Sequence, residues 1–355
     1  TKDAGHALNG DLVQAKLFRD GRRKRRFAKV ETVIERSKIE YVGKMQLGGD
    51  HAFVIPVDPK IHVDFFISKT DLKKFPDGSI VKIAFEEWRS TEKSPRANIL
   101  EYIGVAGTID VEMRSILIEK GFDMEFSPKA MDLLDRVQEE ISAEERKNRR
   151  DFTKIPTFTI DPEDAKDFDD ALSVQRLNDG NWEIGIHIAD VTHFLEEKTA
   201  LDKEAFIRST SVYFPDRVLP MLPERLSNHL CSLVPHEERR CFSAVFHIDS
   251  DNNVTNEWYG KTLIYSDHRF TYEDAQNSIR DAKGLFYDEL YILNKLAKKY
   301  RNKRLKNGAI AFESREARFG FDDTGKPEKI FIKERMDSHK LVEEFMLLAN
   351  RKVAE

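Results

Sequence analysis

The chain has 355 residues, of which 40% are hydrophobic and 34% are charged, and its formal net charge at pH 7 is -5. This length and apolar content suit two or three globular units and exclude a disordered chain. Its two cysteines, Cys231 and Cys241, are too few for a disulfide framework, and no apolar run reaches the roughly 18 to 20 residues that span a bilayer. We therefore expect a cytoplasmic protein with no membrane partner.

Short strands are predicted from residue 1 to about residue 105. The segments GDLVQAKLF, YVGKMQL, HAFVIPV, VDFFI and SIVKIAFEEW are rich in strand-forming residues, and turn sequences such as LGGD and FPDG separate them. Strands at this spacing predict a small β-barrel. We assign residues 1–37 to the end of a first barrel and residues 38–105 to a complete second barrel.

The pattern becomes helical over residues 106–150, which we interpret as a helical linker. There SPKAMDLLDRVQEEIS has a Ser-Pro start and apolar positions three and four residues apart. Residues 151–355 predict a mixed α/β domain. TFTI, ALSVQRL and WEIGIHIADV are typical of strands, whereas LYILNKLAKKYRNKRLKNG, with a stop at Gly308, and SHKLVEEFMLLANRKVAE are typical of helices.

Four aspartates gather in TIDPEDAKDFDDAL, at positions Asp161, Asp167, Asp169 and Asp170. Carboxylates this close repel one another at neutral pH unless cations offset the charge. Oxygen-only ligands suit Mg²⁺ or Mn²⁺, and the segment lacks the glycine and terminal glutamate of a calcium-binding EF-hand loop. A solvated acidic loop is the alternative, but the probable buried strands TFTI and ALSV on either side favour a metal site.

Several motifs in a fixed order resemble the catalytic domain of the ribonuclease II family. They are TIDPEDAKDFDDALSV, IGIHIADVTHF, TSVYFPDRVLPMLPERLSNHLCSL and SHKLVEEFMLLAN, and FVIPVDPKIHVDFFI is similar to the family's second cold-shock domain. The resemblance implies a multidomain protein with an N-terminal OB-fold, cold-shock-like β-barrel followed by a truncated RNB-type α/β catalytic domain. It also implies processive 3′-5′ hydrolysis of single-stranded RNA to nucleoside 5′-monophosphates with Mg²⁺.

The family resemblance also assigns roles to single residues. Asp161, Asp167, Asp169 and Asp170 match the metal-binding aspartates, with Asp169 and Asp170 as the catalytic pair and Asp169 as the most rate-critical. The RNA-binding residues would be Tyr213 and Phe312, which stack on the terminal nucleotides, and Tyr272 and Glu344, which lie near the ribose. Without the resemblance, Tyr213 and Phe312 would be interpreted as core aromatics, and Glu344 as a charge on the helix surface.

Three other features have less specific interpretations. We expect His187 and Asp190, in IGIHIADVTHF, to be structural, because an all-oxygen magnesium site needs no imidazole. The basic run RDGRRKRRFAKV, at residues 19–30, could gather RNA through its phosphates or could be a solvated hairpin tip. In the second barrel, the candidate stacking residues are Phe53, Phe65, Phe66 and Trp88, some of which must be core because strand residues alternate inward and outward.

Two functional hypotheses follow. The first is a 3′-5′ exoribonuclease that uses a pair of metal ions, acts as a monomer and needs no small organic cofactor. The second is an RNA-binding or regulatory protein with an incomplete or vestigial nuclease site. The family's later arginine-bearing motif is absent from these 355 residues, and we therefore expect the isolated chain to be weak or inactive. A sugar-cleaving enzyme with paired carboxylates is a remote third hypothesis.

Overall fold

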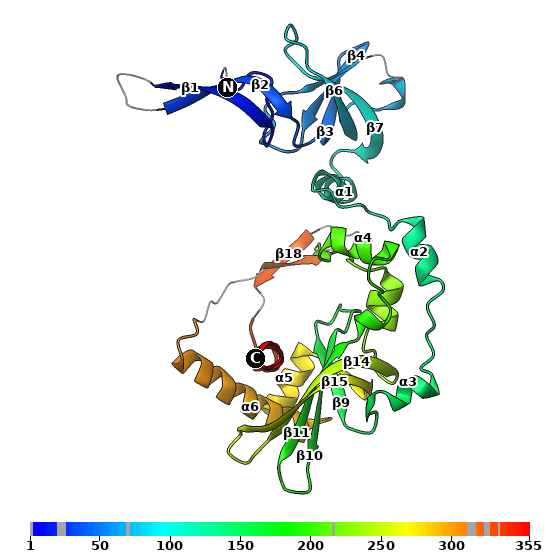
Figure 1. Cartoon of the computed structure of the whole chain (residues 1–355), viewed down its shortest axis with the longest axis vertical. Helices are drawn as coiled ribbons and strands as arrows, with labels where there is room; N and C mark the ends of the chain where they lie inside the picture. Colours follow the sequence, from blue (N-terminus) through cyan, green and yellow to red (C-terminus); the bar gives the residue numbers. More distant parts are fainter. Residues whose placement is uncertain are drawn as a thin grey trace. The chain divides into compact units, whose positions relative to one another are not determined.

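The structure is a computed structural model that describes residues 3–19, 26–68, 72–214, 217–310, 317–322, 327–332 and 334–355. The chain divides into two compact units, Thr1–Glu125 and Phe126–Glu355 (Figure 1). Each unit has its own apolar core, and the two are described separately below.

The first unit contains a closed five-stranded barrel in the order β3-β4-β5-β7-β6. All neighbouring strands are antiparallel except β5 and β7, which are parallel. Alternate residues point inward, so Met45, Phe65 and Ile83 fill the interior. The predicted OB-type barrel is confirmed. Its strands are β3 (Glu40–Leu47), β4 (His51–Pro56), β5 (Phe65–Ser68), β6 (Ser79–Glu87) and β7 (Arg96–Val105).

Two further elements belong to this unit. Helix α1 (Ile109–Glu119) starts at the N-cap Thr108, and its Glu119 carboxylate accepts hydrogen bonds from the Val42 backbone N–H and from Lys38. The hairpin of β1 (Leu12–Arg19) and β2 (Arg26–Glu35) continues into Arg36, whose guanidinium packs over Phe85. The centre of the basic run, residues 20–25, lies outside the described residues. A short 3-10 turn, η1 (Leu72–Lys74), lies between β5 and β6.

The second unit is built on a seven-stranded mixed sheet in the order β16-β9-β10-β11-β14-β15-β8. Most neighbours are antiparallel, but β16 pairs in parallel with β9, and β8 pairs in parallel with β15. The predicted strands TFTI, ALSVQRL and WEIGIHIADV correspond to β9, β10 and β11. The strands are β8 (Arg150–Phe152), β9 (Thr157–Asp161), β10 (Asp170–Arg176), β11 (Trp182–Ala189), β14 (Glu238–Ile248), β15 (Val254–Tyr265) and β16 (His268–Thr271).

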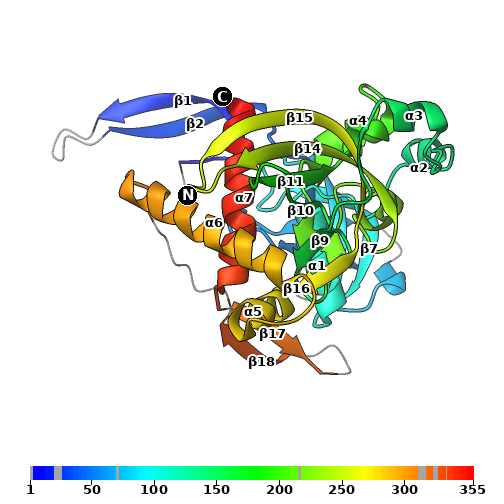
Figure 2. The ribbon, with the colours of Figure 1, turned by 90° about the horizontal axis from the view of Figure 1, so that it is seen from below.

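Helices cover both faces of this sheet. On one face α5 (Tyr272–Asp281), α6 (Tyr287–Lys306) and α7 (Asp337–Ala354) form an apolar cluster with β9, β10, β11, β14 and β16, and Figure 2 shows α6 crossing α7. On the other face a second cluster includes α2 (Pro128–Leu134), α4 (Ala200–Arg208) and the π-helical turn η3 (Arg225–Leu230). Both predicted helices of the domain are confirmed as α6 and α7, and Gly308 follows α6 with φ +96°.

The remaining elements are short. They are α3 (Ala143–Lys147), the 3-10 turn η2 (Val191–His193), the hairpin of β12 (Val212–Tyr213) and β13 (Val218–Leu219), and the hairpin of β17 (Ala317–Phe321) and β18 (Pro327–Ile332). Among the helices of the described residues, none is long and apolar enough to cross a membrane.

Candidate active site

The aspartate cluster occupies the connection between two neighbouring strands of the second sheet. Strands β9 and β10 are antiparallel, with Leu172 opposite Phe158, and the loop of residues 162–169 joins them. Asp161 is the last residue of β9 and Asp170 is the first residue of β10. Since the two strands are paired, their ends hold the first and last aspartate of the motif close together, and Asp167 and Asp169 lie on the loop between them.

Asp161 is the most buried of the four aspartates, with 8% of its surface exposed. Burial, together with the negative charges of Asp170 and Asp169, raises its pKa to about 7, although Thr159 and Arg269 act in the opposite direction. Its Oδ2 atom is buried and has no hydrogen-bond partner among the described residues. A buried carboxylate oxygen without a donor is costly, and a cation would relieve that cost.

Asp169 and Asp170 also have raised pKa values. Burial raises the pKa of Asp170 to about 6, and the neighbouring Asp169 charge adds to the effect. Asp169 is more exposed to solvent, yet the protein atoms crowded around its carboxyl group and the charge of Asp167 raise its pKa as well. The crowding of like charge inferred from the sequence is therefore present in the folded domain.

Tyr213 meets the aspartate loop from a different part of the chain. It lies on β12, and its hydroxyl donates a hydrogen bond of 3.1 Å to Asp167 Oδ2. Its side chain nevertheless remains 66% exposed. The alternative interpretation of Tyr213 as a core aromatic therefore does not hold, and the ring is available to a ligand beside Asp167.

Tyr272 approaches the same cluster from the end of β16. Parallel pairing places Thr271 opposite Asp161, and α5 starts at the next residue. Burial raises the pKa of Tyr272 to about 12, and the charges of Asp170 and Asp161 contribute to the shift. The ring stacks on His339 with centroids 3.9 Å apart. Tyr272 therefore presents a protonated phenol near the two aspartates at neutral pH.

Glu344, another predicted RNA-binding residue, has its described contacts away from this cluster. Glu344, on α7, is 3% exposed and forms ion pairs with Arg304 at 2.5 Å and Arg301 at 3.7 Å, both on α6. Phe312 lies outside the described residues. Glu344 is thus buried between two helices instead of lying on the helix surface.

His187 and Asp190 have the structural roles that were expected. Both ring nitrogens of His187 form hydrogen bonds, to Ser243 at 2.7 Å and to Ser173 at 2.8 Å, and burial lowers its pKa to about 3. The ring is therefore neutral. Asp190 pairs with Arg149 at 2.7 Å, a buried ion pair that fixes the start of β8.

The aspartates fit a magnesium-type ion in chemistry but do not form a complete set of protein ligands. Among the described residues, no three His, Cys, Asp or Glu side chains lie close enough together to hold a metal ion by themselves. Mg²⁺ usually binds only one or two protein carboxylates and fills its octahedron with waters and substrate phosphates. The unpartnered Asp161 oxygen and the raised carboxyl pKa values fit such a partly open site.

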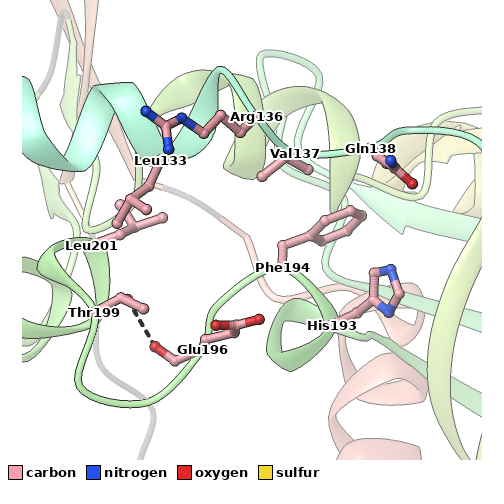
Figure 3. A pocket seen from close by; sticks show the side chains of 9 residues that line it. All are labelled: Leu133, Arg136, Val137, Gln138, His193, Phe194, Glu196, Thr199 and Leu201. Carbon is pink, nitrogen blue, oxygen red and sulfur yellow. Dashed lines mark hydrogen bonds between the residues drawn. The ribbon is translucent and has the colours of Figure 1, made fainter.

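A cavity of about 280 Å³ lies elsewhere in the second unit (Figure 3). Leu133, Arg136, Phe194, Glu196 and Leu201 are among the residues that line it, and Figure 3 shows Leu201 beside Leu133. No aspartate of the cluster contributes to its wall. The cavity is therefore not the proposed metal site.

Two residues that hold the aspartate loop were missed in the sequence. Ser232 contacts the backbone at Lys166 and Phe168, and Arg269 contacts the backbone at Pro162 and Glu163. A single serine after a helical turn and a single arginine in a strand have no signature, so no signal in the sequence could have found them.

Known protein families and relatives match both parts of the chain. A model of the RNB domain family matches residues 149–355, and a cold shock domain model matches residues 53–127. The chain is 34% identical over 362 residues to ribonuclease R of Thermotoga maritima, which covers 100% of this chain and 51% of that protein. It is 35% identical over 345 residues to DIS3-like exonuclease 2 of Schizosaccharomyces pombe. This match covers 89% of this chain and 37% of that protein.

Solved structures show the same fold. Mycoplasma genitalium RNase R in complex with ribose methylated single-stranded RNA superposes with a TM-score of 0.89 at 23% identity, covering 99% of this chain and 56% of that one. Yeast Ssd1, a pseudonuclease, superposes with a TM-score of 0.71 at 19% identity, covering 100% and 50%. The chain spans about half the length of the curated ribonucleases R it matches. Because the RNB match covers more than half of its residues, the chain belongs to the RNB domain family, which confirms the resemblance found in its motifs.

Proposed function

We propose that this chain is the metal-binding half of a 3′-5′ exoribonuclease that hydrolyses single-stranded RNA processively to nucleoside 5′-monophosphates. The observation that supports the proposal is the position of Asp161 at the end of β9 and Asp170 at the start of β10, with the exposed Tyr213 bonded to Asp167 on the loop between them. Relatives named ribonuclease R and DIS3-like exonuclease 2 support it.

In this proposal Asp161, Asp167, Asp169 and Asp170 hold Mg²⁺, or Mn²⁺ in its place. A bound divalent cation would polarise a phosphoryl oxygen and lower the pKa of a bound water. The chain's own contribution is to keep Asp161 and Asp170 desolvated, which strengthens their attraction for a cation. On the family resemblance, we assign Asp169 the most rate-critical role.

The aromatic side chains would position the RNA. An exposed tyrosine ring offers stacking to any base, which suits degradation without sequence preference. The exposure of Tyr213 and its bond to Asp167 support this role. The Tyr272 phenol is a hydrogen-bond donor that could contact a 2′-hydroxyl group. Phe312 as a second stacking residue and Glu344 as a ribose contact remain part of the proposal on the family resemblance alone.

The barrel offers a second aromatic surface for RNA. Phe66 lies 5.6 Å from Phe53 and 5.9 Å from His51, measured between ring centroids, and all three side chains are half-buried. Phe65 belongs to the core, and Trp88 packs against the core and against His6. Of the four barrel aromatics considered in the sequence, Phe53 and Phe66 are therefore the stacking candidates.

Hydrolysis of a 5′-labelled single-stranded RNA tests the function. With Mg²⁺ we expect stepwise shortening from the 3′ end, no shortening in EDTA, and a loss of several orders of magnitude in rate for Asp169→Asn. Asp164→Asn is the matched control, because Asp164 is an exposed carboxylate of the same loop. The test should include the longest natural form of the protein that contains this chain. An unchanged rate for Asp169→Asn would contradict the proposal.

The second candidate is an RNA-binding protein without nuclease activity. The barrel's aromatic surface favours it, and a pseudonuclease has the same fold. The four aspartates speak against it. Measuring RNA affinity and nucleotide release on the same sample separates the two candidates, since this one predicts binding without release in Mg²⁺ or Mn²⁺.

A further inference from the structure

Phe168 is an apolar residue in the middle of the aspartate cluster. Its side chain is 8% exposed and belongs to the apolar cluster that also contains Ala171 and Leu233. Its backbone is held on both sides: its N–H donates to Ser232 Oγ at 3.0 Å, and its carbonyl accepts from the Leu233 N–H at 2.8 Å. Phe168 therefore fixes the position of the chain between Asp167 and Asp169.

The hydroxyl group of Ser232 accepts one hydrogen bond and donates another. The oxygen accepts the Phe168 N–H, and the hydroxyl donates to the carbonyl of Lys166 at 2.8 Å. Ser232 is fully buried. A buried hydroxyl that donates to one peptide group and accepts from another, two residues apart, fixes the local path of the backbone.

Arg269 holds the other end of the same loop. It lies on β16, opposite Thr159 of β9, and its Nη2 atom donates to the carbonyls of Pro162 and, at 2.9 Å, Glu163. Its guanidinium also lies over the ring of Phe168, 5.5 Å from the centroid. One side chain thus connects the residues that follow Asp161 to the residue that precedes Asp169.

We propose that Ser232 and Arg269 are positioning residues that fix the aspartate loop, and that they thereby set the spacing of the carboxylates for a divalent cation. Neither needs to contact the cation. The inference rests on the proposed function only in assigning a divalent cation to this loop.

The physical argument is one of preorganisation. Four carboxylates on or beside a short loop repel one another, and a free loop would relax by moving them apart. Hydrogen bonds to the backbone resist that relaxation. The free energy needed to hold the like charges together therefore comes from folding, and the cation does not have to supply it on binding. Groups that orient metal ligands typically contribute 10- to 100-fold in metal affinity.

The test compares Ser232→Ala and Arg269→Gln with the wild-type chain. Mn²⁺ alone is the probe, titrated by electron paramagnetic resonance, and we expect each variant to bind it about 10- to 100-fold more weakly. Amide exchange of residues 160–170 should become faster in both variants, with the Phe168 amide most affected in Ser232→Ala. Arg269→Lys, which keeps the charge, should bind with intermediate affinity. Arg280→Gln on α5 is the matched control, because Arg280 is exposed and pairs only with Asp281 among the interactions described for it.

Mn²⁺ affinity within twofold of wild type in both variants, with unchanged exchange in the loop, would overturn the proposal. If circular dichroism shows that Ser232→Ala does not fold, the two Arg269 variants provide the test. The proposal then requires Arg269→Lys to bind Mn²⁺ more tightly than Arg269→Gln does. Failure of the proposed function looks different: the wild-type chain would bind Mn²⁺ and respond to these substitutions, yet the natural protein would release no nucleotide from RNA. A wild-type chain that binds no Mn²⁺ would also refute the cation role assigned to the loop.

Discussion

The hydroxyl of Tyr213 donates a hydrogen bond of 3.1 Å to Asp167 Oδ2, although the two residues are 46 positions apart. This contact joins the β12–β13 hairpin to the aspartate loop. The bond orients the tyrosine ring, and most of the side chain stays exposed. One residue therefore connects the carboxylates to a surface on which a base could stack.

Tyr213 substitutions should separate these two contributions. Tyr213→Ala removes the ring, and we expect single-stranded RNA to bind more weakly by about 1 to 3 kcal/mol. Tyr213→Phe keeps the ring and removes only the hydroxyl, so RNA affinity should change less. Fluorescence anisotropy with a labelled RNA in EDTA measures this without hydrolysis. Tyr291→Ala, an exposed tyrosine on α6, should have no effect. Equal losses for Ala and Phe at position 213 would argue against stacking.

Asp161→Asn should change stability in a pH-dependent way. The pKa of Asp161 is about 7 in the folded state, against about 3.9 in an unfolded chain. Between these values the folded state keeps a proton that the unfolded state has released, so wild-type stability falls as pH rises through this window. Asparagine does not ionise. In metal-free buffer the variant should therefore gain stability relative to wild type between pH 5 and pH 8, by about 3 kcal/mol.

Urea unfolding at both pH values in EDTA measures that difference. Mg²⁺ added at pH 8 should stabilise the wild type more than the variant, because it binds the ionised carboxylate in the folded state. A stability difference that is the same at pH 5 and pH 8 would show that Asp161 does not titrate in this range.

The Arg304–Glu344 pair predicts a large effect on stability. Among the described residues, Arg304→Ala leaves the buried Glu344 carboxylate with the more distant Arg301 as its cation. We expect a loss of about 3 kcal/mol, at the low end for a broken buried pair. The double variant with Glu344→Gln should recover part of this loss in urea unfolding. If Glu344→Gln instead leaves stability intact and removes the preference for RNA over DNA, the ribose role is supported.

Adjacent phenylalanines of the barrel should behave differently. Phe65 is fully buried, so Phe65→Ala should cost about 3 to 5 kcal/mol of stability. Phe66 is half-buried on the aromatic surface, so Phe66→Ala should cost less stability and weaken RNA binding by about 1 to 3 kcal/mol. Thermal unfolding and anisotropy on both variants check this pair. RNA affinity unaffected by Phe66→Ala would remove the barrel surface from the proposed function.

The sequence predicted those parts of the fold in which local pattern and tertiary environment agree. Strands β9 to β11 follow from short apolar runs, and α6 and α7 from apolar positions three and four residues apart. The helix expected at residues 127–142 ends earlier, at Leu134. Arg225 donates a hydrogen bond to the carbonyl of Leu134, and Arg240 donates to the carbonyls of Glu139 and Glu140. These carbonyls therefore bond to side chains that are distant in sequence.

The candidate site likewise contains some residues that the sequence predicts and others that it does not. The four aspartates are recognisable because they lie close together in the sequence, between residues 161 and 170. The residues that hold them are not, since Arg269 contacts a carbonyl 107 positions away and Ser232 one 66 positions away. The roles of Tyr213, Tyr272, Phe312 and Glu344 and the boundaries at residues 37, 105 and 150 stay predictions. Contacts of long sequence separation depend on the whole fold and leave no local pattern.

The parallel pairing of β16 with β9 has a consequence for the newly made polypeptide. Strand β9 gains this partner only after residue 271 has left the ribosome, about 100 residues after the aspartates. A nascent chain that ends before Arg269 carries all four carboxylates but not the arginine that holds their loop, so the loop is completed late in folding.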